Sequence, residues 1–215
     1  KAIILAAGLG SRLLPLTKDK PKCLVEFSGK TLLDRLLKTF KICGVNDIVL
    51  VIGHKNKKID HTDLDLVKNE RYSNTGIMHS LFCAREKFEK TVIVSYGDII
   101  FENSVLEKLL ESKYDITAVV DKKWKRYWKL RTDKPLSDVE SLLMDKKNFI
   151  TNIGEKNLKS FDKICGQFIG LIMFQNKGLD DLKEFIDKIY SEATKEYNPL
   201  NTNVPFEQST LTNFL

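Results

Sequence analysis

Residues 1–24 read KAIILAAGLGSRLLPLTKDKPKCL, and this stretch decides the fold class. The run AIILAA is continuously apolar and ends at a glycine, which is typical of a strand buried on both faces of a parallel sheet. Gly8 and Gly10 follow in a turn whose backbone can approach a ligand closely. Exposed N–H groups in such a turn can bind phosphate oxygens. The start of the chain therefore predicts a buried strand that leads into an anion-binding loop.

Cationic side chains return to this loop. Arg12 stands two residues after Gly10, and Lys22 follows Pro21. Pro15 and Pro21 oppose helix formation, so we expect the segment to fold back over the site as a lid. The dinucleotide fingerprint is excluded because a leucine replaces its third glycine, and the Walker loop is absent. Taken alone, the turn could also be an ordinary connection from a strand to a helix.

The rest of the chain alternates strand and helix patterns. Units of strand, helix and strand at this spacing give right-handed crossovers and a parallel sheet. We expect strands over residues 47–53 and 115–121, a strand with a loop over residues 64–72, and a strand that ends in an acidic turn over residues 91–101. We expect helices over residues 31–44, 76–88, 105–112, 122–131 and 179–197. Residues 140–154 and 166–174 are interpreted as strands of an added lobe. Residues 198–215 begin as a polar stretch and then start a helix, and we expect the natural chain to continue.

The composition indicates one globular domain. The chain has 215 residues, of which 42% are hydrophobic and 30% charged, enough to bury a core without disulfides. The net charge of +6 suits an anionic partner, but the lysines are spread along the chain, which favours a small phosphorylated ligand over nucleic acid. The four cysteines lack metal-ligand spacing, and no apolar run approaches the roughly 20 residues of a membrane span. We therefore expect a cytoplasmic protein with free thiols and no membrane partner.

The run LAAGLGSRLLPLTKDKPKCL resembles the signature of the nucleotidyltransferase superfamily: L-A-A-G-x-G-x-R, then P-x-T, then P-K-x-L. The resemblance implies an α/β, Rossmann-like fold, with a mixed and mostly parallel sheet flanked by helices. It also implies transfer of a nucleoside monophosphate from an NTP to a phosphorylated acceptor, with release of pyrophosphate. Residues 1–215 would then form one nucleotidyltransferase domain. Its nucleotide-binding half would end near residue 120, and a small acceptor-binding lobe would occupy about residues 121–175.

The same resemblance gives roles to side chains of the first loop. Arg12 would hold the β- and γ-phosphates, and Lys22 would lie against the α-phosphate and the attacking oxygen. In-line displacement at phosphorus spreads negative charge, so positioned cations are what the chemistry needs. Together with Asp98, these two cations form the expected catalytic set. The expected nucleotide-binding residues are Leu5, Ala6, Ala7, Gly8, Leu9, Gly10, Ser11, Arg12, Lys22, Asn74, Ser80 and Gly97.

Asp98 is the candidate ligand for Mg²⁺. It follows a predicted strand, at the edge of a parallel sheet where ligands bind. Mg²⁺ usually takes one or two carboxylates together with substrate phosphates. The residue could instead belong to a plain turn after Gly97, although the family has an aspartate at this point. Relatives add a second carboxylate late in the chain; Asp180 and Asp181 fit a solvated first helical turn better, so we expect that ligand beyond Leu215.

Asn74 and Ser80 stand where family members read the base, although Asn74 also fits the N-cap of the following helix. Members that use sugar 1-phosphates often carry a glutamine here, and residues 70–85 contain none. Residues 119–142, VVDKKWKRYWKLRTDKPLSDVESL, resemble a branch with phosphocholine, aminoethylphosphonate and phosphoglutamine cytidylyltransferases. This resemblance favours CTP as the nucleotide.

The candidate acceptor-binding residues follow from this stretch. Two tryptophans one helical turn apart can cover a cation or pack in a core, and the nearby carboxylates can bind an ammonium group or cap a turn. The candidates are Trp124, Trp128, Arg131, Asp138, Glu140 and Glu155.

The sequence therefore predicts a Mg²⁺-dependent cytidylyltransferase that uses CTP and a phosphorylated, amine-bearing acceptor. The expected acceptor is phosphoglutamine, phosphocholine or aminoethylphosphonate, and the CDP-activated product would serve to decorate surface or capsular polysaccharide. The alternatives are a sugar-1-phosphate nucleotidylyltransferase and a non-catalytic nucleotide-binding relative, and a homodimer is compatible with the sequence.

Overall fold

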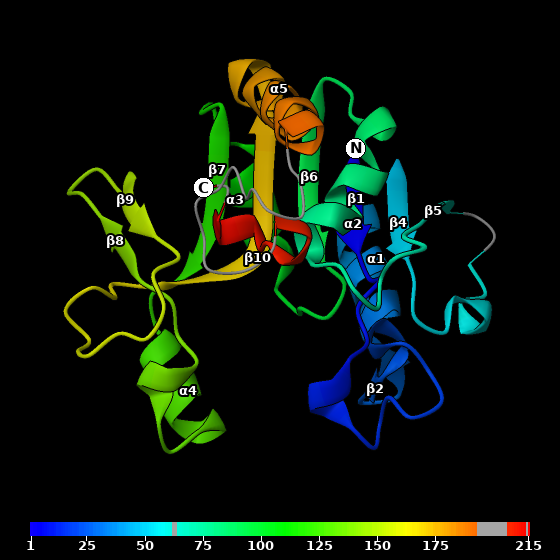
Figure 1. Cartoon of the computed structure of the whole chain (residues 1–215), viewed down its shortest axis with the longest axis horizontal. Helices are drawn as coiled ribbons and strands as arrows, with labels where there is room; N and C mark the ends of the chain where they lie inside the picture. The colour runs from blue at the N-terminus through cyan, green and yellow to red at the C-terminus, as the bar shows by residue number, and fades with distance from the viewer. Residues whose placement is uncertain (62–63, 193–205, 214) are drawn as a thin grey trace.

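The computed structural model describes residues 1–61, 64–192, 206–213 and 215. Its centre is a six-stranded sheet with the strand order β5-β4-β1-β6-β10-β7 (Figure 1). The strands of this sheet are β1 (Ala2–Leu5), β4 (Ile48–Ile52), β5 (Asp65–Lys68), β6 (Thr91–Tyr96), β7 (Ile116–Asp121) and β10 (Gln167–Gln175). A small hairpin of β2 (Glu26–Phe27) and β3 (Lys30–Thr31) lies outside the sheet.

The sheet is mixed and mostly parallel, as the sequence predicts. β1 pairs in parallel with β4 and β6, and β4 pairs in parallel with β5. β10 runs antiparallel to both of its neighbours, β6 and β7. The assignment of residues 166–174 to the added lobe is therefore wrong. This apolar segment enters the central sheet because its residues Leu171–Phe174 are buried on both faces.

Helices cover both faces of the sheet and bury alternate residues of its strands. α1 (Leu32–Ile42) and α3 (Asn103–Leu110) pack against the face that carries Ala2 and Ile4 of β1. α2 (Ile77–Cys83) and α5 (Asn176–Glu192) cover the face that carries Ile3 and Leu5. α2 is shorter than expected and gives way to a 3-10 turn at Arg85–Lys87. α5 begins earlier than expected, and residues 193–197 of the expected helix lie outside the described residues.

The bounds of α1 are set by signals that the sequence carries. The Thr31 hydroxyl accepts a hydrogen bond from the backbone N–H of Asp34, at 3.0 Å, and caps the first turn. Gly44, just past the helix, adopts φ 79°, a left-handed conformation that a glycine takes without strain. A helix fixed at both ends in this way sets the crossover from β1 to β4.

A small lobe is inserted between β7 and β10 (Figure 1). It contains α4 (Trp124–Arg131) and an antiparallel pair, β8 (Leu142–Met144) and β9 (Ile150–Ile153), which confirms the predicted strands over residues 140–154. Its own core is built from Trp124, Val139 and Ile164. The lobe leaves the sheet at Asp121 and returns at Gln167, and these two residues are paired in the β7–β10 register. Both of its connections therefore start from one point of the sheet.

The final described segment packs back onto the body of the protein. The N–H groups of Gly76 and Met78 donate to the backbone oxygens of Glu207 and Ser209, at 2.6 Å and 3.3 Å. Two 3-10 turns, Phe206–Gln208 and Leu211–Asn213, stand where a terminal helix was expected. Within the described part of the chain, no helix combines the length and the apolarity that crossing a membrane requires.

Candidate active site

A cleft of about 360 Å³ opens where β1 and β6 end. Because both strands are parallel, their carboxyl ends bring the glycine turn and the segment after β6 to the same edge of the sheet. Nine of the predicted residues line this cleft: Leu5, Ala6, Gly8, Gly10, Ser11, Arg12, Lys22, Gly97 and Asp98. Two further predicted residues of the turn, Ala7 and Leu9, do not line it.

The glycine turn is held in shape by the segment that follows it. Gly10 has φ 67°, and an added Cβ would lie 3.0 Å from Cγ2 of Thr17 and 3.1 Å from Cβ of Lys22. The Thr17 hydroxyl donates to the backbone oxygen of Gly10 at 2.9 Å. Gly97 is similarly confined, since a Cβ there would lie 2.9 Å from Cβ of Ala6. Both glycines therefore permit close packing of backbone around the cleft.

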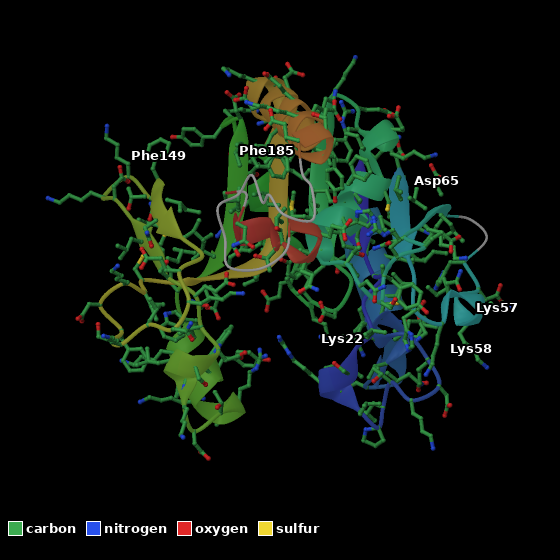
Figure 2. All side chains as sticks on the ribbon, in the orientation of Figure 1. Lys22, Lys57, Lys58, Asp65, Phe149 and Phe185 are labelled. Carbon is green, nitrogen blue, oxygen red and sulfur yellow. The ribbon has the colours of Figure 1, made fainter. Side chains whose placement is uncertain are left out.

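Lys22 and Asp98 form an ion pair in the cleft, between Nζ and Oδ2. Lys22 lies in a 3-10 turn, Lys22–Leu24, and Asp98 follows the end of β6. Their side chains are 35% and 27% exposed, so both remain accessible to a ligand. Figure 2 shows Lys22 projecting from its turn towards the space between the sheet and the small lobe. The structure thus joins two of the three predicted catalytic residues directly, and it places Arg12 in the same cleft.

Three lining residues escaped the sequence analysis: Cys23, Ile77 and Tyr96. Burial raises the pKa of the Cys23 thiol to about 12, so this neighbour of Lys22 stays a neutral thiol rather than a nucleophile. Burial also raises the pKa of Tyr96, and the carboxylates of Glu140 and then Asp98 raise it further. Tyr96 directly precedes Gly97 and Asp98, and that position at the end of a buried strand was the available signal.

The two residues expected to bind the base, Asn74 and Ser80, do not lie where the sequence predicts. Ser80 is buried, and its Oγ accepts a hydrogen bond from Nδ2 of Asn69 at 3.1 Å. Asn69 also donates to Oγ1 of Thr75 at 3.0 Å, so this buried amide braces the loop before α2. Asn74 is exposed and does not cap α2, whose N-cap is Gly76 without a side-chain hydrogen bond. Neither Asn74 nor Ser80 lines the cleft of the described residues.

The two tryptophans of α4 do not form an open aromatic pair. Trp124 is 3% exposed and belongs to the core of the lobe, where its ring meets Trp128 edge to face at 6.1 Å. The guanidinium of Arg131 lies over the ring of Trp128, 5.4 Å from its centroid, and pairs with Asp138 at 3.0 Å. These four candidate acceptor residues therefore contact one another within the lobe.

The remaining acceptor candidates, Glu140 and Glu155, lie in different surroundings. Glu140 is held by Gln167 of β10, whose Nε2 donates to the backbone oxygen of Glu140 at 2.7 Å. Its carboxylate pairs with Lys156 at 3.4 Å, and its negative charge helps to raise the pKa of Tyr96, which lines the cleft. Glu140 itself is not among the residues that line the cleft. Glu155 instead accepts hydrogen bonds from Lys163 and from the amide of Asn152, both at 2.8 Å, on an exposed part of the lobe.

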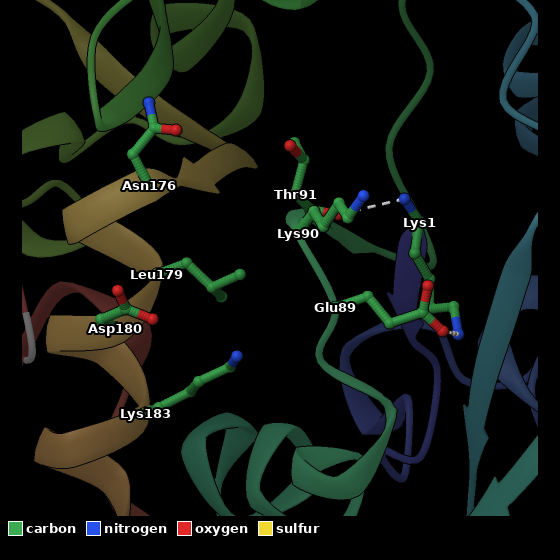
Figure 3. Close-up of a pocket in the computed structure, with 8 residues that line it drawn as sticks. All are labelled: Lys1, Glu89, Lys90, Thr91, Asn176, Leu179, Asp180 and Lys183. Atoms are coloured by element: carbon green, nitrogen blue, oxygen red, sulfur yellow. Dashed lines mark hydrogen bonds and ion pairs between the residues drawn. The ribbon is translucent and has the colours of Figure 1, made fainter.

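A second, open hollow lies at the opposite edge of the sheet, near the start of β6 (Figure 3). It mixes cationic and anionic side chains and contains none of the predicted site residues. Its charged lining consists of Lys1, Glu89, Lys90, Asp180 and Lys183. Asp180 lies on the first half of α5 in this hollow, away from Asp98, as its interpretation as a solvated helical residue predicts.

A model of the MobA-like NTP transferase domain matches residues 2–156. This chain belongs to that family. The matched range includes the glycine turn, Lys22 and Asp98, and the match confirms the prediction from the first loop that the chain is a nucleotidyltransferase.

Individual relatives and solved structures show which kinds of nucleotidyltransferase this chain is similar to. It is 35% identical over its full length to the CTP:phosphoglutamine cytidylyltransferase of Campylobacter jejuni, 86% of which is covered. The inositol-1-phosphate CTP transferase from T. maritima is 26% identical, with a TM-score of 0.65 over 86% of this chain and 74% of that one. The CTP:phosphocholine cytidylyltransferase from Streptococcus pneumoniae has the same fold, with a TM-score of 0.67 at 24% identity over 89% of this chain and 77% of that one.

Proposed function

We propose that this nucleotidyltransferase transfers CMP from CTP to a small phosphorylated acceptor that bears an amine, and releases pyrophosphate. The observation that carries the proposal is the meeting of Lys22 and Asp98 in the glycine-turn cleft. The full-length similarity to a phosphoglutamine cytidylyltransferase supports CTP and this type of acceptor. We infer that the product serves as a CDP-activated group for surface polysaccharide.

The reaction needs positioned charge and no side-chain nucleophile. A phosphate oxygen of the acceptor attacks the α-phosphorus of CTP and forms a new P–O bond. The bond from the α-phosphorus to the bridging oxygen breaks, and pyrophosphate leaves with that electron pair. Lys22 neutralises charge on the equatorial oxygens, while Arg12 and the backbone N–H groups of the glycine turn hold the departing phosphates.

The donor set fits Mg²⁺ bound together with a substrate. Asp98 supplies one partly exposed carboxylate at the cleft, and Mg²⁺ commonly uses one or two carboxylates with substrate phosphates and water. The described residues contain no cluster of three or more metal-ligating side chains, so the phosphates would complete the coordination. When bound, the ion would neutralise phosphate charge beside the α-phosphorus.

The proposed acceptor site, at Glu140 and Lys156, offers an anion and a cation close together. Glu140 and Lys156 form an ion pair at 3.4 Å. Glu140 can bind the ammonium of an amino-acid acceptor and Lys156 its carboxylate, so that two ion pairs with the acceptor replace the one within the protein. The sugar of a sugar phosphate is uncharged and offers no cation to the Glu140 carboxylate. This pair favours a zwitterionic acceptor such as a phosphorylated amino acid.

The test is a pyrophosphate-release screen with Mg²⁺. CTP, UTP, dTTP, ATP and GTP are each combined with phosphoglutamine, phosphocholine, aminoethylphosphonate and glucose 1-phosphate. We expect the highest kcat/KM with CTP and an amine-bearing acceptor. Faster turnover of glucose 1-phosphate than of every amine would instead assign the chain to sugar activation.

A further inference from the structure

We propose that Lys55 is a positioning residue that holds the loop carrying Arg12 and Lys22 over the nucleotide cleft. The inference deepens the proposed function, on which its kinetic part rests. Lys55 comes from the turn after β4, outside the glycine loop, and it does not line the cleft.

Among the residues that the structure describes, the side-chain contacts of Lys55 lead to the loop. Its Nζ donates to the backbone oxygen of Thr17 at 3.3 Å and to the backbone oxygen of Lys18. Both oxygens belong to the segment between Arg12 and Lys22. A cation that binds two carbonyl oxygens from a distant part of the chain ties the outer side of this loop to the end of β4.

The backbone around Lys55 is itself fitted to the glycine turn. The N–H of His54 donates to the backbone oxygen of Ala7 at 3.0 Å. Gly53 has no room for a side chain, because a Cβ would lie 2.7 Å from that same oxygen of Ala7. Residues 53–55 therefore fix the start of the turn through Ala7 and the following loop through Thr17 and Lys18.

The backbone conformation of Lys55 indicates that surrounding contacts hold this residue in place. It has φ 51° and ψ 31°, in the left-handed region that a lysine rarely adopts. Such a conformation persists where surrounding contacts hold it, and it is found preferentially at functional sites. We call the Lys55 side chain and its two hydrogen bonds the strap. A glycine takes this backbone conformation without strain, so Lys55→Gly removes the strap without straining the turn.

The experiment compares four variants of the full chain with the wild type. Lys55→Met keeps the length of the side chain and removes its charge, and Lys55→Gly also relieves the left-handed backbone. Lys55→Arg restores a donor for both carbonyl oxygens. Lys57→Met removes a neighbouring charge that lies on the outer edge of the molecule, away from Lys22 (Figure 2).

The first measurement is hydrogen–deuterium exchange over residues 11–22 without substrate, so its result does not depend on the proposed function. We expect exchange about tenfold faster in Lys55→Met and Lys55→Gly, the scale of a lost charge-assisted hydrogen bond. Residues 11–22 should exchange at the wild-type rate in Lys55→Arg and Lys57→Met. The melting temperature of Lys55→Gly should be no lower than that of the wild type. Wild-type exchange in both Lys55→Met and Lys55→Gly would overturn the proposal.

The second measurement is kcat and KM with the NTP that the wild type uses best. We expect kcat to fall by about tenfold or more in Lys55→Met and Lys55→Gly, because small displacements of catalytic groups cost up to about a hundredfold. Lys55→Arg should recover most of this loss. Faster exchange with unchanged kcat would show that the strap orders the loop without positioning its cations, and would overturn the catalytic part. A wild type inactive with every NTP would refute the proposed function, while the exchange result would stand.

Discussion

The ring of Tyr96 lies directly on Gly170: a Cβ on this glycine would stand 2.4 Å from Cδ2 of the tyrosine. Gly170 has φ 87°, and β10 shifts its register against β7 in the same stretch. A few residues earlier, Gln167 of β10 holds the backbone of Glu140. One irregular strand therefore positions both Tyr96, which lines the cleft, and the backbone of Glu140, for which we propose a role in acceptor binding.

This arrangement predicts that Gly170→Ala is destabilising and also impairs the site. The added methyl group would displace the Tyr96 ring, and the left-handed backbone would cost about 1–3 kcal/mol. We expect a lower melting temperature together with a higher KM for the acceptor. Thermal unfolding and acceptor titration at saturating CTP measure the two effects. A variant with wild-type stability would show that the ring can move away freely.

Lys22→Ala should act on catalysis more than on binding. A cation beside the reacting phosphorus gains most of its interaction in the transition state, so we expect kcat to fall by about a hundredfold or more, with a modest change in the KM for CTP. Lys20→Ala is the control, because Lys20 pairs with Glu26 at 3.5 Å outside the cleft. An unchanged kcat with a much higher KM for CTP would show that Lys22 stabilises bound CTP and the transition state equally.

CTP should be preferred over the other nucleotides by at least tenfold in kcat/KM, about 1.4 kcal/mol of discrimination. The similarity to CTP-using enzymes motivates this prediction, since Ser80 is bound to Asn69 and does not line the cleft. Competition assays with the five nucleotides at equal concentration measure it. Equal use of UTP or dTTP would refute it.

Glu140→Gln should weaken recognition of an amine-bearing acceptor. The substitution keeps the shape of the side chain and removes the charge that would face the ammonium, so we expect the acceptor KM to rise by about tenfold, on the scale of a charged hydrogen bond. The KM for CTP should stay within about twofold, as expected for a residue outside the nucleotide cleft. Glu86→Gln, an exposed carboxylate after α2, is the matched control. Unchanged acceptor kinetics would remove Glu140 from the acceptor site.

His79 should make the fold sensitive to mild acid. Burial, and then the nearby Arg71, lower the pKa of His79, whose Nδ1 lies 3.0 Å from the hydroxyl of Tyr190. Below about pH 6.5 the unfolded chain binds a proton that the folded chain resists, so the free energy of unfolding falls. Denaturation at pH 7.5 and 5.5 should show a smaller difference in His79→Gln than in the wild type, while Tyr190→Phe keeps the imidazole and its sensitivity. Equal differences in His79→Gln and the wild type would exclude this histidine.

The first half of the molecule is predictable because its signals are local. The apolar run of β1, the glycine turn and the Thr31 cap each lie within a few residues of what they determine. Their spacing yields the crossover to β4 and the cleft at the ends of β1 and β6. The pairing of Lys22 with Asp98 joins residues far apart in the chain, yet it follows from their places at one edge of a parallel sheet.

The errors arise where a local pattern is compatible with two environments. A continuous apolar run fits a central strand or a lobe strand equally well, so the position of β10 between β6 and β7 depends on pairings that only the folded chain reveals. The spacing of Trp124 and Trp128 shows that they share a helix face, but not that this face meets Val139 and Ile164 in a core. Ser80 could be placed only by finding its partner Asn69.

Asp121 and Gln167, where the small lobe leaves and rejoins the sheet, are paired with each other. The lobe is therefore an insertion whose two ends lie side by side in the sheet. Everything between these two neighbours can change in length or sequence without altering the register of the strands that carry the glycine turn and Asp98. If the lobe binds the acceptor, as we propose, a change in this single insertion would alter acceptor choice while the glycine turn and Asp98 keep their positions. The paired ends also mark the two points at which a lobe from another enzyme could be grafted.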